Sequence, residues 1–256
     1  MQATIGTTMP ATGNKSYTGY RLSIRCNADG FSFSVCSTLN DSVVQTDRFP
    51  VSEPTGAADV LRQALRKPYL MDYSFQSVEL VADTLTTIVP LEHFNKSDML
   101  AYYRLCFPSM VNGQWSMTDM QYQILSSLEA AMIFRLDQDI LHIVQECYPD
   151  VKVCCTDAQL LEHFASLQEK RPAPDAEPQC DVYLHVESHS FFLAAFRRSK
   201  LLYAASQAAD NDNDRTFLLL GIWKALELRA QRDACHLEGA SKELRKTLSE
   251  YILNIE

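Results

Sequence analysis

The chain has 256 residues, of which 46% are hydrophobic and 21% charged, and its formal net charge is -9. These proportions are typical of globular proteins, and the length is sufficient for two domains with separate cores. The acidic balance argues against a protein that binds the nucleic-acid backbone, because such proteins present basic surfaces.

The eight cysteines have no regular spacing and no Cys-x-x-Cys pair; they lie at positions 26, 36, 106, 147, 154, 155, 180 and 235. Several fall in apolar runs, where a thiol acts as a small hydrophobic group. We therefore expect eight reduced thiols in a cytoplasmic protein. The sequence shows neither a signal peptide nor an apolar stretch of about 20 residues, so we expect no membrane span.

Residues 1–17 are polar and aperiodic, which predicts a loose tail. From residue 22 to 49, three runs alternate apolar and polar residues and are separated by turn residues, including Asn27–Gly30. This pattern predicts a three-strand meander. A helix is predicted over 56–67, and strands over 77–82 and 86–89. A helix over 96–107 and a strand over 131–136 complete this part of the chain.

A helix over 138–148, a strand over 151–155 and a helix that Thr156 caps are predicted next. Residues 169–179 contain three prolines among charged residues, which predicts an exposed linker. Strand, turn, strand, turn and strand then recur over 182–206, before a helix over 214–232, a strand over 234–237 and a helix over 241–255. The repeated meander followed by a helix predicts an α/β fold of two equivalent lobes.

The residues from Cys180 to Leu202, CDVYLHVESHSFFLAAFRRSKLL, resemble the start of the second lobe in actin-like ATPases. The residues Val151–Leu161, VKVCCTDAQLL, are similar to the strand and helix that close the first lobe of those proteins. Pilus-assembly and cell-division members are the most similar. The hairpin Asp29-Gly30-Phe-Ser-Phe-Ser and the ending Tyr251-Ile-Leu-Asn-Ile also resemble an uncharacterised bacterial family of unknown function.

This resemblance implies two actin-like, ribonuclease H-like lobes that face each other across a cleft. The first lobe would span 18–168 with inserted strands, and the second would span 180–256 after the linker 169–179. A resemblance of this kind specifies the fold far better than the function.

In active actin-like ATPases, the first hairpin of each lobe carries Asp-x-Gly, whose glycine admits phosphate to the backbone and whose aspartate organises Mg²⁺ or water. The matching positions here are Arg25–Asn27 and His185–Glu187, so both motifs are absent. Asp29 and Gly30 lie nearby without an intervening residue. The Gly-Gly adenosine loop is reduced to Glu238–Ala240. The departures imply no catalytic residues and no cofactor, with ATP and Mg²⁺ as the alternative.

Asp210, Asp212 and Asp214 have the spacing of the first half of a calcium loop. The sixth and twelfth positions of that loop require Gly and Glu, and they hold Arg215 and Gly221 here. We favour the alternative, an acidic helix cap.

No metal site is expected from the histidines or cysteines. His185 and His189 would lie about 13 Å apart on an extended chain. Cys154, Cys155 and His163 lack the paired spacing of zinc sites.

The apolar run Phe217–Trp223 fits either a partner-binding face or a helix buried between a sheet and its neighbour, and we favour burial. From its sequence alone, the function of the chain is not determinable. The leading hypothesis is a degenerate actin-like protein that binds an unidentified protein partner without catalysis. The alternatives are an actin-like nucleotide-binding protein with weak or no ATPase activity, and a small-molecule site in the cleft.

Overall fold

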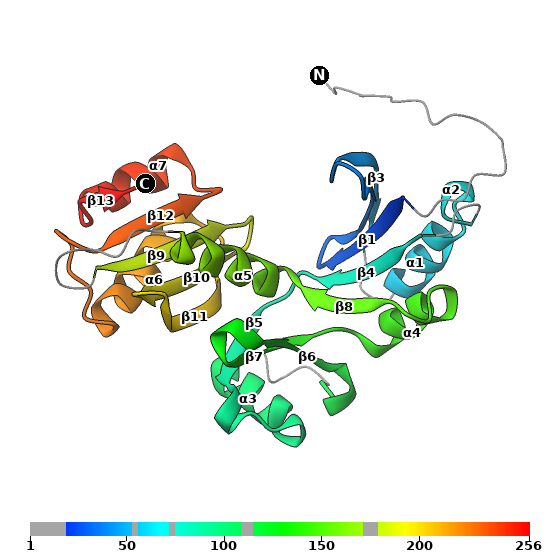
Figure 1. The fold of residues 1–256 in the computed structure, drawn as a ribbon, viewed down its shortest axis with the longest axis horizontal. Helices are drawn as coiled ribbons and strands as arrows, with labels where there is room; N and C mark the ends of the chain where they lie inside the picture. The colour runs from blue at the N-terminus through cyan, green and yellow to red at the C-terminus, as the bar shows by residue number, and fades with distance from the viewer. Residues whose placement is uncertain (1–18, 53–55, 72–74, 109–114, 171–178) are drawn as a thin grey trace. The chain divides into compact units, whose positions relative to one another are not determined.

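The structure is a computed structural model that describes residues 19–52, 56–71, 75–108, 115–170 and 179–256 (Figure 1). The chain forms two compact units. The first unit comprises Met1–Thr84 with Arg135–Thr156, and the second comprises Leu85–Phe134 with Asp157–Glu256. The predicted tail and most of the predicted linker lie outside the described residues, and the predicted lobe boundaries stay a prediction.

The first unit holds a five-stranded sheet in the order β3-β2-β1-β4-β8. Its first three strands form the predicted antiparallel meander, and β4 and β8 add in parallel. Alternate residues of β1, such as Leu22 and Ile24, are fully buried, as is Leu61 of α1. Its elements are β1 (Tyr20–Asn27), β2 (Gly30–Ser37), β3 (Val43–Pro50), α1 (Ala57–Leu65), α2 (Pro68–Met71), β4 (Ser77–Ala82), α4 (Gln138–Cys147) and β8 (Lys152–Cys155).

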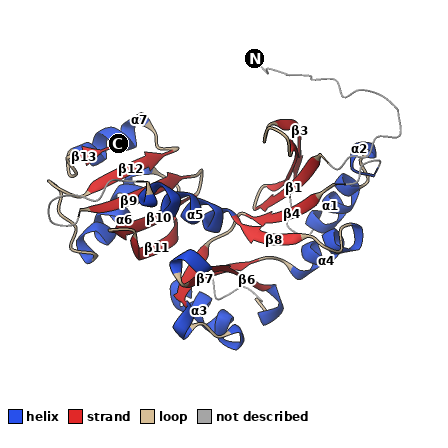
Figure 2. Ribbon diagram, in the orientation of Figure 1, coloured by secondary structure: helices blue, strands red, loops and turns tan. Residues whose placement is uncertain are grey.

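The second unit repeats this topology in a five-stranded sheet of order β11-β10-β9-β12-β13. Here too an antiparallel meander precedes a helix, and the two later strands pair in parallel. The structure therefore confirms two equivalent units, which Figure 2 shows coloured by secondary structure. The elements are α5 (Thr156–Glu169), β9 (Cys180–Val186), β10 (Ser190–Arg197), β11 (Lys200–Ala208), α6 (Asp212–Ala225), β12 (Ala234–Glu238), α7 (Lys242–Ser249) and β13 (Asn254–Ile255).

Helices cover both faces of the second sheet. Val182 and Leu184 of β9 belong to a buried cluster that also contains Leu219 of α6 and Leu248 of α7. Tyr183 points to the opposite face, because successive side chains of a strand alternate. Its ring stacks on Phe164 of α5 with 4.8 Å between centroids. Strands β9 and β10 of this meander are therefore buried on both faces.

A separate three-stranded sheet, of order β5-β7-β6, also belongs mostly to the second unit. Helix α3 packs on it through Met99 and Tyr103. The sheet is attached through Thr86, whose backbone N–H donates to Ser206 Oγ at 3.0 Å and whose hydroxyl donates to Asp157 Oδ2 at 2.7 Å. Its elements are β5 (Thr86–Pro90), α3 (Met99–Cys106), β6 (Met120–Leu125) and β7 (Ala130–Arg135).

The two last predicted helices are shorter than expected. Helix α6 ends at Ala225 because Glu227 adopts a left-handed backbone with φ of 54°, and the Leu228 N–H turns back to the Trp223 carbonyl. Helix α7 ends at Ser249, and the chain then forms β13 alongside β12. This parallel pairing involves residues 20 apart, so helical periodicity alone does not reveal it.

Candidate functional site

The second unit places the candidate residues His185 and Glu187 at the end of β9, where the chain turns into β10. The turn is closed by its own polar groups. The Glu187 N–H donates to the Ser190 carbonyl at 3.0 Å, and Ser190 Oγ donates to the Glu187 carboxylate at 3.3 Å. The Glu187 amide is therefore already satisfied within the hairpin.

Glu238 and Gly239, which the resemblance matches to the adenosine loop of actin-like ATPases, lie beside this hairpin. Gly239 has φ of +71°, and a Cβ there would come within 2.5 Å of the Val186 carbonyl oxygen, so the position requires glycine. His185 Nδ1 lies 3.4 Å from a Glu238 carboxylate oxygen, and Nε2 lies 3.9 Å from a Glu187 carboxylate oxygen. Two carboxylates thus flank one imidazole at the end of the strand. Their negative charges would repel a polyphosphate.

Arg215 of α6 holds the same hairpin from the interior of the protein. Its side chain is only 9% exposed. One guanidinium nitrogen, Nη2, donates to the carbonyl oxygens of Glu187 and Ser188, each at 2.8 Å, and to that of Ala209 at 3.1 Å. The other, Nη1, donates to Asp212 Oδ1 at 2.8 Å. The hairpin therefore presents its carbonyls to a buried cation of its own chain.

Asp212 extends this network to α7. Ser241 Oγ donates to Asp212 Oδ2 at 2.6 Å. The hydrogen bond from Ser241, together with that from Arg215 and its positive charge, lowers the pKa of the Asp212 carboxyl below its ordinary value. The hairpin, the start of α6 and the start of α7 are consequently one connected polar cluster.

The structure confirms the helix-cap interpretation of residues 210–214. Asn211 is the capping residue, and its side-chain oxygen accepts from the Asp214 N–H at 2.9 Å. Across the described ranges, no group of three or more His, Cys, Asp or Glu side chains is arranged to hold a metal ion. From the sequence, Arg215 stands out only as a misfit to the calcium loop, and its hydrogen bonds to the hairpin are not predicted. Its spacing from Leu219 and Trp223 on the buried face was the available signal.

The first unit places the other candidate residues, Arg25, Asn27, Asp29 and Gly30, around the β1–β2 hairpin. Asn27 Oδ1 accepts from the Asp29 N–H at 3.0 Å, and Asn27 pairs with Gly30 across the turn. Gly30 has φ of +132°, and a Cβ there would lie 2.2 Å from the Phe49 carbonyl oxygen. This glycine therefore admits strand β3 to the hairpin.

The neighbouring side chains at the end of β1 are also paired or neutral. Arg25 lies 3.7 Å from Asp83. Burial, with the charges of Asp137 and Asp83, raises the pKa of the Cys26 thiol to about 11, so this thiol stays protonated at neutral pH. All eight cysteines of the chain are free thiols.

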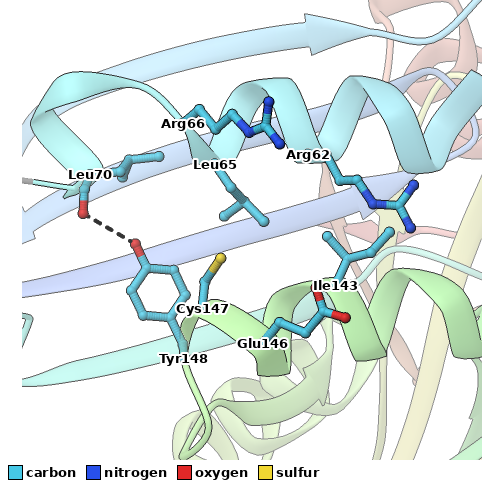
Figure 3. A pocket seen from close by; sticks show the side chains of 8 residues that line it. All are labelled: Arg62, Leu65, Arg66, Leu70, Ile143, Glu146, Cys147 and Tyr148. Carbon is cyan, nitrogen blue, oxygen red and sulfur yellow. Dashed lines mark hydrogen bonds between the residues drawn. The ribbon is translucent and has the colours of Figure 1, made fainter.

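A groove of about 540 Å³ lies between helices α1, α2 and α4 of the first unit (Figure 3). Leu65, Leu70 and Ile143 form its apolar lining and are themselves largely buried. Burial raises the pKa of the Tyr148 phenol to about 12, which keeps the phenol neutral. The phenol donates to the Leu70 carbonyl at 3.4 Å. The lining residues are Arg62, Leu65, Arg66, Leu70, Ile143, Glu146, Cys147 and Tyr148.

The groove carries two arginines in a protein whose net charge is -9. Arg62 pairs with Asp59 at 3.3 Å, whereas Arg66 makes no ion pair within the described part of the chain. Apolar surface beside an available guanidinium fits a ligand that combines an apolar group with a carboxylate. The sequence does not predict this groove, because its walls come from segments about eighty residues apart.

The chain belongs to a family of unknown function. The family model described as "Protein of unknown function (DUF3822)" matches residues 12–255. Comparison with the curated proteins gives no match. None of the helices in the described residues combines the length and the apolar composition needed to cross a membrane.

Solved structures establish the fold as actin-like. A Bacteroides thetaiotaomicron protein with an actin-like ATPase fold and unknown function is 25% identical, with a TM-score of 0.77 over 93% of this chain and 90% of that one. A chain of the PilM–PilN type IV pilus biogenesis complex is 14% identical, with a TM-score of 0.50 over 92% and 87%. The cytoplasmic domain of EpsL from the Vibrio cholerae type II secretion system is 12% identical, with a TM-score of 0.44 over 93% and 88%.

Proposed function

We propose that this member of the DUF3822 family is a cytoplasmic, non-catalytic actin-like protein that acts by binding a protein partner. The observation that carries the proposal is the second hairpin, whose backbone is bonded to Arg215 and whose strand end is lined by Glu187 and Glu238. The eight free cysteines support a reducing compartment.

The hairpin disfavours phosphate for two physical reasons. Its Glu187 N–H already donates to Ser190, so this amide is not available to a phosphate oxygen. A phosphate about 4 Å from the Glu187 carboxylate would be repelled by about 4 kcal/mol at an effective dielectric constant near 20. Solvent screening lowers this figure, because the Glu187 side chain is 32% exposed. The affinity lost is thus up to about a thousandfold.

Titration calorimetry with Mg-ATP tests this part of the proposal. We expect no ATP turnover above background and no binding tighter than about millimolar, given that estimated loss. Micromolar binding by the unmodified protein would refute the proposal. If the same binding vanished in Glu187→Trp, the hairpin would be the nucleotide site, and the nucleotide-binding alternative would replace the proposal of a non-catalytic partner-binding protein.

The groove between α1 and α4 is where we place the partner. We propose that its occupant is a protein segment with an apolar side chain beside an acidic one, which would match Leu65 and Arg66. A protein that shares this fold forms the PilM–PilN complex, so the fold is compatible with work in a protein complex.

A capture experiment from the native host tests the groove, followed by mass spectrometry. We expect the unmodified protein to retain a set of proteins that Arg66→Glu loses. Arg104→Glu is the matched control, because Arg104 is exposed on α3 and lies outside the groove. It should retain the full set. Identical sets with all three baits would show that the groove is not the docking site.

A further inference from the structure

Helix α6 presents two different faces. Arg215, Leu219 and Trp223 are buried against the rest of the second unit. On the outer side, four exposed residues follow one another at spacings of three, four and three: Asp214, Phe217, Gly221 and Lys224. Residues at these spacings form a single stripe along a helix, as they do on each helix of a coiled coil. We refer to these four residues as the α6 stripe.

Two residues of the α6 stripe, Phe217 and Gly221, lower the stability of a single copy of the chain. The Phe217 side chain is 78% exposed. Gly221 lies inside the helix, where glycine is less stable than alanine. A Cβ at Gly221 would meet nothing within 4 Å, unlike one at Gly30 or Gly239. Nothing in the described residues therefore requires a glycine at this position.

The α6 stripe is complementary to a copy of itself. Phe217 lies two residues before Leu219 and Gly221 lies two residues after it, while Asp214 and Lys224 lie five residues before and after. Two α6 helices can pair in an antiparallel arrangement whose two-fold axis crosses the outer side of the helices at the level of Leu219. Each Phe217 then faces the Gly221 of the other copy. Each Asp214 then faces a Lys224, and symmetry produces every contact twice.

The charges agree with this pairing. Lys224 makes no ion pair within the described residues, and the hydrogen bonds of Asp214 are made with Asn211. The helix dipole alone favours an acidic residue at the start and a basic one at the end. It does not explain an exposed phenylalanine one turn from an open glycine. A second helix explains all four residues, because the ring fills the space over the glycine.

We propose that the chain forms a two-fold symmetric dimer through the α6 stripe, with Phe217 of each copy packed over Gly221 of the other. This surface is distinct from the groove between α1 and α4, and it goes beyond the proposed function. A single pair of helices buries a small area, so we expect a weak dimer whose Kd is micromolar or higher.

Sedimentation velocity over a series of concentrations up to about 200 µM tests the dimer, because small interfaces associate weakly. We expect the unmodified protein to shift from monomer to dimer. Gly221→Gln should lose the dimer while melting at an equal or higher temperature, because glutamine favours a helix and its Cβ would meet nothing within 4 Å among the described residues. Ala101→Gln adds the same side chain at an exposed position of α3 and should leave the dimer unchanged. A protein that is monomeric throughout, or a dimer that Gly221→Gln does not weaken, would overturn the proposal.

A charge exchange tests the antiparallel register. Asp214→Lys alone brings two lysines together at each end of the interface, and Lys224→Glu alone brings two acidic residues together. Neither variant should form a dimer by itself. Mixed in equal amounts, the two variants should pair with each other, because every 214–224 contact then joins opposite charges. A mixture that stays monomeric while the unmodified protein dimerises would exclude this register.

Discussion

Replacing Arg215 with methionine tests whether the buried guanidinium holds the second hairpin in place. Methionine keeps most of the apolar stem and has a helix propensity close to that of arginine. The change removes the donors to the carbonyl oxygens of Glu187, Ser188 and Ala209, and to the Asp212 carboxylate. Its effect therefore reports these hydrogen bonds with little contribution from the helix itself.

The expected loss of stability follows from the groups left without a donor. A buried acceptor that loses its partner costs about 1–3 kcal/mol. The two turn carbonyls can recover water in part, whereas the Asp212 carboxylate loses the cation beside it. We expect Arg215→Met to lower the free energy of unfolding by about 2–4 kcal/mol, which is less than for a fully buried pair, because the Asp212 side chain is 34% exposed and water screens its charge. This is a large share of the 5–15 kcal/mol typical of a native protein.

Urea unfolding followed by tryptophan fluorescence measures this loss, since Trp223 lies two turns along α6 from Arg215. Arg104→Met is the matched control at an exposed position, and it should change the stability by no more than about 0.5 kcal/mol. A loss below about 1 kcal/mol in Arg215→Met would refute the role assigned to the guanidinium, because a single unmade buried bond already costs that much.

Two further predictions concern single side chains. Gly30→Ala should lower the free energy of unfolding by about 2–3 kcal/mol, because φ is +132° and the added Cβ would clash with the Phe49 carbonyl; unchanged urea unfolding would contradict this. The lowered pKa of Asp212 means that its charged form stabilises the fold above the ordinary pKa of 3.8, and that this stabilisation is lost as the pH falls through the lower folded value. The stability difference between the unmodified protein and Asp212→Asn should therefore be constant above about pH 5 and shrink below 3.8. A difference that is independent of pH in acid unfolding experiments would exclude this linkage.

The sequence predicted the repeated unit because the burial of a strand is a local pattern. Leu22 and Ile24 alternate with polar residues and are both fully buried in β1, and β4 has the predicted bounds Ser77–Ala82. The ends of the last helices were wrong because they depend on non-local or unsignalled features. Glu227 adopts a left-handed backbone conformation, which is predictable from sequence only where the residue is glycine. Strand β13 forms only by pairing with β12.

The candidate site was predictable only in part. Glu187 and Glu238 could be placed by resemblance, and the structure brings both carboxylates beside His185. The burial of Arg215 is signalled by its spacing from Leu219 and Trp223, but its hydrogen bonds are not, because they reach backbone carbonyl oxygens, which every residue carries. The groove was invisible for a related reason, since α1 and α4 meet only in the folded unit.

The cluster around Arg215 links the two proposals made for the second unit. A hairpin that binds phosphate must keep backbone donors free and its approach uncharged, whereas here the Glu187 amide is bonded and carboxylates line the strand end. The guanidinium of Arg215, which bonds the hairpin carbonyls, also donates to Asp212 in the first turn of α6. Arg215 directly follows Asp214, the first residue of the α6 stripe. Because the α6 stripe begins at that turn, the contacts that hold the hairpin also set the direction of the helix that we propose joins two copies.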